Sequence, residues 1–252
     1  MFQPCIVSAN EADKEITQFR LSTLLEWVMT HKLLILRGFN SLDREELLSY
    51  CAKQANLLHW DFGPVMEMKV DVDPKNYLFT EGDVPLHWDG AFYQEPRFLF
   101  FQCIEAPHPQ MGGETLFVNT EKVWEDASPE TKKAWQKYQL NFSTEKIAHY
   151  GGKIQRNLVT THPETGKTIL RFAEPVTENY LNPVEVSVEG KDARVSAMLL
   201  NEINVAVREE PYCYYHQWHS GDYLIADNFS LLHGRNAFKQ ESPRHLRRIQ
   251  IL

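Results

Sequence analysis

YCYYHQWHSGDYLIAD, residues 212 to 227, contains two strand-like runs on either side of a turn signal at Ser220-Gly221. Turn signals also separate other strand-like runs, as at Gly112-Gly113 and Thr165-Gly166. These runs are KLLILRGFN (32–40), FLFFQCIEA (98–106), TLFVNT (115–120), TILRFAE (168–174) and LRRIQIL (246–252). Because strands do not alternate regularly with helices and no glycine-rich phosphate loop occurs, the pattern predicts a β-sandwich or jelly roll.

A few helices are expected beside these strands. Asp43, with Glu46 three residues later, is typical of a helix N-terminus, and apolar residues at helical spacing follow it. A second helix is expected to begin at 128–130, where Ser, Pro and Glu are consecutive, and to run through Trp135. A third is expected from about Asp192 to Arg208. We expect these helices to pack outside the active site.

Length and composition indicate an ordinary globular protein. The 252 residues are 43% hydrophobic and 24% charged, so residues 1–252 are expected to form a single domain with a packed core. The formal net charge of −8 argues against a protein that binds nucleic acid through phosphate contacts, and it favours a small-molecule ligand. The sequence leaves the oligomeric state open, and a homo-oligomer is compatible with it.

The N-terminus and the cysteines bear on location. MFQPCIVSANEADKE has neither a positive n-region nor an apolar h-region, and no stretch of 18 apolar residues occurs in the chain. A cytoplasmic protein without a membrane span is therefore expected. Four cysteines, far apart in sequence and without a Cys-x-x-Cys motif, are expected to be reduced thiols: Cys5, Cys51, Cys103 and Cys213.

VPLHWDGAFYQ, residues 84 to 94, carries the most informative polar residues. His87 and Asp89 are two positions apart, so on a strand both would face one side and Trp88 would face the other. One His-x-Asp triplet is weak evidence in a chain with ten histidines. The triplet at 162–164, His-Pro-Glu, has the same ligand chemistry and is expected to be only a turn.

DNFSLLHGRNAF, residues 227 to 238, supplies a third metal ligand. His233 lies in an apolar, strand-like run, just before Gly234. Two histidines and one carboxylate on one face of a metal leave adjacent coordination positions open, as in non-haem Fe(II) oxygenases. The sequence therefore predicts an Fe(II) site made of His87, Asp89 and His233.

A co-substrate site is expected near this metal. Arg244 follows His233 by 11 residues, and Thr115 follows Asp89 by 26 residues. If 2-oxoglutarate chelates the iron through its keto acid end, its distal carboxylate requires a fixed cation and a hydroxyl group. Arginine can hold a carboxylate with two parallel hydrogen bonds, which lysine cannot do. Arg244 and Thr115 are the expected pair.

Taken together, these motifs resemble the TauD/TfdA-type Fe(II)- and 2-oxoglutarate-dependent dioxygenases. The resemblance extends over nearly the whole chain, from LLILRGF through HWDG, GGET, HPETG and LLHGR to RHLRR. It implies a mainly β fold with flanking helices around a double-stranded β-helix (jelly roll) core. It also implies that O2 is a co-substrate, that the residues above have the stated roles, and that Arg248 lies near the metal-bound carboxylate or a substrate anion.

Longer runs resemble one group within that family. VPLHWDG, LRFAEP (170–175), LNP (181–183) and IADNFSLLHGRNAF, with PRHLRR, are similar to the PvcB-like oxygenases, which act on tyrosine isocyanide. This resemblance implies desaturation of a tyrosine-derived isocyanide in isonitrile biosynthesis, with the carboxylate kept or lost. Three alternatives stay open: a generic TauD/TfdA hydroxylase of another small anion, a non-catalytic metal-binding β-barrel, and a zinc hydrolase.

Overall fold

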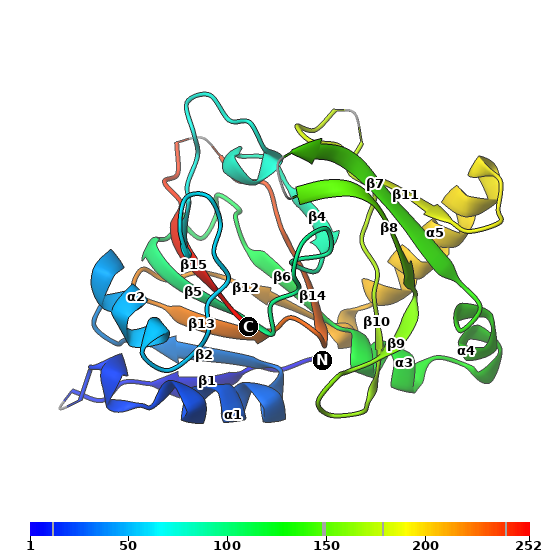
Figure 1. Ribbon diagram of the computed structural model, residues 1–252. Helices are drawn as coiled ribbons and strands as arrows, with labels where there is room; N and C mark the ends of the chain where they lie inside the picture. The colour runs from blue at the N-terminus through cyan, green and yellow to red at the C-terminus, as the bar shows by residue number, and fades with distance from the viewer. Residues whose placement is uncertain (12, 148–149, 178, 240) are drawn as a thin grey trace.

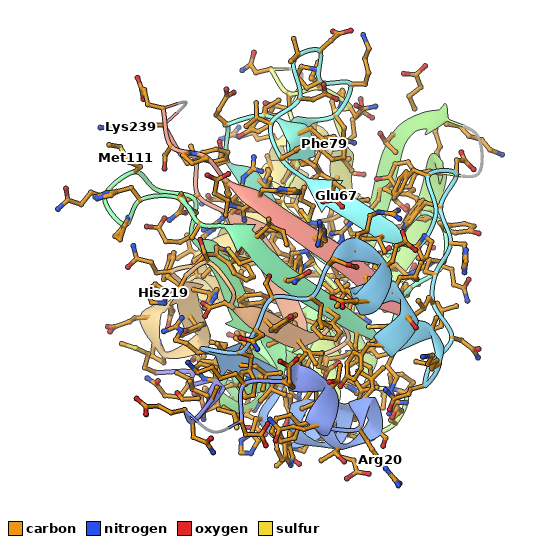
Figure 2. The ribbon with its side chains drawn as sticks, turned by 90° about the vertical axis from the view of Figure 1, so that its left-hand side faces the viewer. Arg20, Glu67, Phe79, Met111, His219 and Lys239 are labelled. Atoms are coloured by element: carbon orange, nitrogen blue, oxygen red, sulfur yellow. The ribbon has the colours of Figure 1, made fainter. Side chains whose placement is uncertain are left out.

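Six strands form the larger of two facing sheets in the computed structural model, which describes residues 1–11, 13–147, 150–177, 179–239 and 241–252 (Figure 1). Their order is β1-β2-β13-β5-β15-β3, and only the β1–β2 pair is parallel. The bounds are β1 (Cys5–Ser8), β2 (Leu33–Arg37), β3 (Val65–Met68), β5 (Phe98–Glu105), β13 (Tyr223–Asp227) and β15 (His245–Ile251). Figure 2 places Glu67 on β3 beside β15, with Phe79 above it in the connection that follows β3.

Four antiparallel strands form the second sheet, in the order β12-β6-β14-β4. The bounds are β4 (Val84–His87), β6 (Thr115–Asn119), β12 (Cys213–His216) and β14 (Leu231–Arg235). The inner core between the sheets combines Leu99, Phe101 and Leu224 of the larger sheet with Phe117 and Leu231 of the smaller one. Because the sheets are hydrogen-bonded separately, the jelly roll is not a closed barrel.

Helices α1 (Leu21–His31) and α2 (Arg44–Ala52) cover the outer face of the larger sheet, and Figure 1 shows α1 below β1 and β2. The first turn of α2 is held by a capping box, in which Asp43 accepts from the Glu46 N–H and Glu46 accepts from the Asp43 N–H. This cap was expected. Helix α1 was not, and its N-cap residue, Arg20, makes no side-chain cap hydrogen bond.

The outer face of the smaller sheet packs against helices and a third sheet. Helix α5 (Ala193–Val207) buries Leu200, Ile203 and Val207 there, and Asp192 caps it by accepting from the Val195 N–H. The other helices are α3 (Thr120–Asp126) and α4 (Pro129–Trp135). The third sheet is β11-β7-β8, made of β7 (Gln139–Ile147), β8 (Tyr150–Asn157) and β11 (Glu185–Val188), and β9 (Val159–Thr161) pairs with β10 (Thr168–Leu170). Short 3-10 helices span Ile16–Gln18, Tyr77–Phe79 and Glu210–Tyr212.

The mainly β fold with flanking helices is thus confirmed, and so are the three expected helices. The strand expected over 168–174 is shorter, because β10 ends at Leu170. All four cysteines are free thiols, and only Cys5 is not fully buried. Among the described residues, no helix combines the length and the apolar composition needed to cross a bilayer.

Candidate metal centre

His87, Asp89 and His233 meet at one end of the smaller sheet. His87 is the last residue of β4, and His233 lies opposite it on β14. The sequence pattern predicted that Asp89 lies on the same strand as His87. Instead, β4 ends at His87, and Asp89 lies in the turn that follows. The side chain of Trp88, between them, packs in the apolar cluster on the outer face of the smaller sheet. His87 and Asp89 therefore point to the same side, as two residues at positions i and i+2 of a strand would, although Asp89 itself lies beyond the end of the strand.

One atom from each of the three side chains points into a common space. Asp89 Oδ1 lies 3.5 Å from His87 Nε2 and 3.6 Å from His233 Nε2. All three ligand atoms lie within 4.8 Å of one another, and the two imidazole centroids are 4.3 Å apart. Two imidazole nitrogens and one carboxylate oxygen at these separations match the donor set used by non-haem Fe(II) oxygenases.

The protonation states suit metal binding. His87 Nδ1 lies 2.9 Å from the Pro85 carbonyl, so this nitrogen carries the proton and leaves the Nε2 lone pair available. Burial, with the neighbouring His87, lowers the pKa of His233 to about 3, which keeps its imidazole neutral. Burial alone would raise the pKa of Asp89, but Arg248 and the two histidines outweigh it and hold that pKa well below its usual value. The residues present therefore fit a divalent cation.

Backbone contacts fix the turn that carries Asp89. The Asn228 side chain accepts a hydrogen bond from the Asp89 N–H at 2.9 Å and donates to the Asp89 and Pro96 carbonyls at 3.0 and 2.8 Å. Gly90 has φ +88°, and a Cβ there would lie 2.2 Å from the Gln94 carbonyl oxygen. Asn228 and Gly90 therefore set the position of the Asp89 backbone.

The second oxygen of Asp89 is held by two donors from β15. Arg248 Nη1 lies 2.8 Å from Asp89 Oδ2, and Gln250 Nε2 donates to the same oxygen at 2.6 Å. With Oδ2 bound in this way, Oδ1 is the oxygen that faces the two histidines. Arg248, which the resemblance placed near a metal-bound carboxylate or a substrate anion, thus pairs with the carboxylate of Asp89.

Arg244 and Thr115 lie together on the far side of the histidines. Arg244 Nη2 donates to Thr115 Oγ1 at 3.4 Å, Arg244 Nε donates to the Gly113 carbonyl at 3.1 Å, and Trp218 Nε1 donates to Thr115 Oγ1 at 2.9 Å. Because Thr115 accepts in both of its contacts, its own hydroxyl proton is free to be donated. Burial lowers the pKa of Arg244 to about 9, and among the described residues no carboxylate forms an ion pair with it.

A small cavity joins these two groups. Its walls include His87, His233, Thr115, Arg244 and Arg248. A buried guanidinium without an anionic partner is costly, so it favours an incoming carboxylate at this end of the cavity. The arrangement suits a dicarboxylate that reaches from the metal side to Arg244.

A second cavity, of about 240 Å³, opens on the other side of the triad. Its lining includes His87, Asp89, Glu174 and Arg248, and most of its wall is apolar or aromatic: Trp60, Phe62, Met66, Tyr77, Leu78, Phe79, Trp88, Phe92, Phe142, Tyr150, Val176 and Val184. Burial raises the pKa values of Tyr77 and Tyr150, so both hydroxyls stay protonated. The cavity suits a small aromatic molecule.

The competing His-x-Glu triplet lies away from this site. The His162 side chain is fully buried, and its Nε2 donates to Asp227 at 3.2 Å, while its Nδ1 accepts from the Glu164 and Thr165 N–H groups. His162 thus organises the turn between β9 and β10, as expected. Sequence reasoning missed four residues that contact the site: Asn228, Gln250, Trp60 and Trp218.

Comparisons with known proteins agree with this geometry. The family model described as "Taurine catabolism dioxygenase TauD, TfdA family" matches residues 8–250. A protein of Fischerella ambigua named 3-((Z)-2-isocyanoethenyl)-1H-indole synthase is 45% identical over 250 residues, which cover 98% of this chain and 92% of that protein. A tyrosine isonitrile desaturase of Erwinia amylovora is 32% identical, covering 99% of this chain and 88% of that protein.

A solved structure is also similar. It is described as PvcB, an Fe, alpha-ketoglutarate (2-oxoglutarate) dependent oxygenase from an isonitrile synthetic pathway. The TM-score is 0.79 at 30% sequence identity, and the match covers 99% of this chain and 87% of that one. The jelly roll, the paired histidines and the buried arginines thus occur in a chain that resembles enzymes of one chemical class throughout its length.

Proposed function

The chain belongs to the TauD/TfdA family and is an Fe(II)- and 2-oxoglutarate-dependent oxygenase, and we propose that it desaturates a tyrosine-derived isocyano acid. The observation that carries this proposal is the full-length similarity to enzymes named for isonitrile chemistry, at 45% and 32% identity. Residues 1–252 act as one catalytic domain in this proposal, because the site draws on segments from Trp60 to Gln250.

His87 Nε2, Asp89 Oδ1 and His233 Nε2 are the proposed iron ligands. Arg244 and Thr115 are the proposed partners of the distal carboxylate of 2-oxoglutarate, since the guanidinium and the free hydroxyl proton both face the cavity beside the histidines. Bound iron, with 2-oxoglutarate and O2 as co-substrates, would supply an oxidant that removes hydrogen from a C–H bond of the substrate, with release of succinate and CO2.

The aromatic cavity is the proposed site that binds the substrate and excludes water from it. Its apolar wall excludes water and holds a flat ring by packing, and the carboxylate of an isocyano acid would lie toward the metal and Arg248, whose Nη1 also pairs with Asp89. Positioning of the benzylic carbon over the triad selects the C–H bond that is broken. The product gains a carbon–carbon double bond, with the carboxylate kept or lost as CO2.

An indole substrate is the second candidate. The relative that shares 45% of its residues is named as the synthase of an isocyanoethenyl-substituted indole, whereas the tyrosine isonitrile desaturase shares 32%. An indole is larger than a phenol, and its only polar edge group is an N–H donor. The two candidates therefore differ in which ring the cavity accepts, and they share the same metal and co-substrate groups.

Mass spectrometry of single reactions tests both candidates. The iron-loaded protein is incubated with 2-oxoglutarate and either the tyrosine or the tryptophan isocyano acid, and the product is expected to lack two hydrogens, or those hydrogens and CO2. Recovery of both acids unchanged would refute the isonitrile assignment. Succinate release with another small anion would then support the generic hydroxylase.

Variants test the ligand set. His87→Ala and His233→Ala are expected to abolish succinate formation, and turnover in either would refute the assignment of these ligands. His31→Ala is the matched control, because His31 is an exposed histidine at the end of α1. It is expected to form succinate at the unsubstituted rate. A protein that binds metal but consumes no 2-oxoglutarate with any substrate would support the non-catalytic alternative.

A further inference from the structure

Trp60 stands at the boundary between the aromatic cavity and β15. It begins a tight turn in which the Trp60 and Gly63 backbones exchange two hydrogen bonds, at 2.9 and 3.3 Å. Its indole is half-buried, stacks on Phe62 at 6.3 Å and packs against Tyr93 at 5.4 Å. The segment before the turn is tied to β15, where the Leu58 N–H donates to the Gln250 carbonyl at 2.9 Å.

A hydrogen-bonded chain leads from this indole to the metal centre. Trp60 Nε1 donates to Gln250 Oε1 at 2.6 Å, and Gln250 Nε2 donates to Asp89 Oδ2 at 2.6 Å. Gln250 is only 3% exposed. An indole N–H can only donate and an ionised carboxylate can only accept, so a single amide orientation satisfies both neighbours. Both hydrogen bonds therefore run in the same direction, from Trp60 through Gln250 to Asp89.

Gln250 is not needed to balance the charge of Asp89. Arg248, two residues earlier on the same face of β15, already pairs with the same carboxylate oxygen at 2.8 Å. What Gln250 adds is a connection, because its other end contacts a wall residue of the cavity. Arg248 has no such contact with Trp60 in the described structure, and its other side-chain hydrogen bond is to Met66 Sδ at 3.2 Å.

We propose that Trp60, Gln250 and Asp89 form a relay through which an aromatic ligand in the cavity tightens metal binding. A ring packed on Trp60 restricts the indole and keeps its N–H on Gln250. Gln250 then holds Asp89 Oδ2, so that Oδ1 stays directed at His87 and His233. The proposal rests on the proposed function in taking Asp89 as a metal ligand. Trp60 and Gln250 are positioning residues in this scheme.

Coupling of this kind is reciprocal and can be measured without turnover. Mn(II) binding is followed by electron paramagnetic resonance of the free ion, with and without the tyrosine and the tryptophan isocyano acids, and without 2-oxoglutarate. In the unsubstituted protein, the acid that binds is expected to lower the Kd for Mn(II) roughly five-fold. Trp60→Phe keeps an aromatic ring and removes the N–H, so it is expected to lose most of that factor. For each protein, the Kd for Mn(II) without the acid is divided by the Kd with the acid. Comparing these ratios cancels any effect of the substitution on Mn(II) affinity alone.

Two further variants separate the relay from simple packing. Phe62→Leu removes a stacked ring and leaves the indole N–H in place, so the five-fold factor is expected to persist. Gln250→Leu breaks the chain at its centre and is expected to lose the factor, as Trp60→Phe does. An equal factor in Trp60→Phe and the unsubstituted protein, or no factor in the latter, would overturn the relay alone. Absence of Mn(II) binding would overturn the metal site and the relay together.

Discussion

Arg248 Nη1 lies 2.8 Å from Asp89 Oδ2, and both side chains are almost fully buried. This ion pair joins strand β15 of the larger sheet to the turn that follows β4 of the smaller sheet. Two opposite charges in a dry interior depend on each other, because either one alone would keep the full cost of its lost hydration. The contact therefore serves the architecture and the proposed metal centre together.

Arg248→Met is expected to lower the free energy of unfolding of the metal-free protein by about 3 kcal/mol, because it leaves a buried carboxylate without its cation. Urea unfolding in EDTA measures this. Added Mn(II) should narrow the difference, since a bound cation takes over the compensation of Asp89. Arg44→Met is the control: its ion pairs with Glu45 and Glu67 are partly exposed, so a change within about 0.5 kcal/mol is expected. Equal losses in the two variants would contradict the prediction.

The stability of the metal-free protein is expected to fall as the pH drops below about 6.5. The pKa of His233 is lowered to about 3 in the folded protein, whereas an unfolded histidine titrates near 6.5. Between these values the unfolded chain binds a proton that the folded chain does not, so this term contributes about 1.4 kcal/mol per pH unit. His233→Gln removes it. Urea unfolding at about pH 6.5 and 5.5 should show that the free energy of unfolding falls less with decreasing pH in the variant than in the unsubstituted protein. An equal fall in both proteins would count against a buried neutral His233.

Arg244→Lys is expected to raise the KM for 2-oxoglutarate roughly 30-fold, because a point charge replaces two parallel charged hydrogen bonds worth about 2 kcal/mol. Steady-state succinate release measures the KM, and Mn(II) affinity should be unchanged because Arg244 does not contact the triad. Thr115→Ser keeps the hydroxyl and should have a small effect, whereas Thr115→Val should raise the KM. An unaltered KM in Arg244→Lys would show that another group binds the carboxylate.

Only one thiol is expected to react in the native protein. Burial raises the pKa values of Cys51 and Cys103 to about 12 and that of Cys213 to about 11, while Cys5 is partly exposed on β1. Iodoacetamide at about pH 8 should therefore label Cys5 alone, and all four cysteines in urea, as peptide mass spectrometry would show. Rapid native labelling of Cys51 would mean that α2 opens frequently.

The sequence was most informative where a residue type and its spacing carry the chemistry. His87, Asp89 and His233 could be selected as a set because few residue types bind iron, and the fold places their ligand atoms within 4.8 Å. Helix α2 could be predicted because its capping box is a local signal. Helix α1 lacks a capping side chain, so its start had no comparable signal, although its apolar spacing was available. On β7, Leu140 and Phe142 alternate with polar neighbours, which is also a strand signal in the sequence.

The supporting residues were beyond reach for a different reason. Asn228 and Gln250 are common polar residues, and neither has a ligand-like spacing to Asp89 in the sequence. Their roles depend on tertiary contacts, such as the Asn228 hydrogen bonds to the Asp89 backbone, which arise only when distant strands are brought together. The end of β4 at His87 likewise depends on the turn at Gly90, which is fixed by its approach to Gln94.

The place of β15 in the larger sheet determines when, during folding, the metal site can form. This strand lies between β5 and β3. Arg248 and Gln250 are on the strand, and Arg244 directly precedes it. Pairing of residues 245–251 with residues 98–105 closes a very long loop, and contacts of this kind form slowly. Until β15 docks, Asp89 has neither its cation nor its amide donor. Acquisition of high-affinity metal binding is therefore a kinetic marker for one of the late steps of folding.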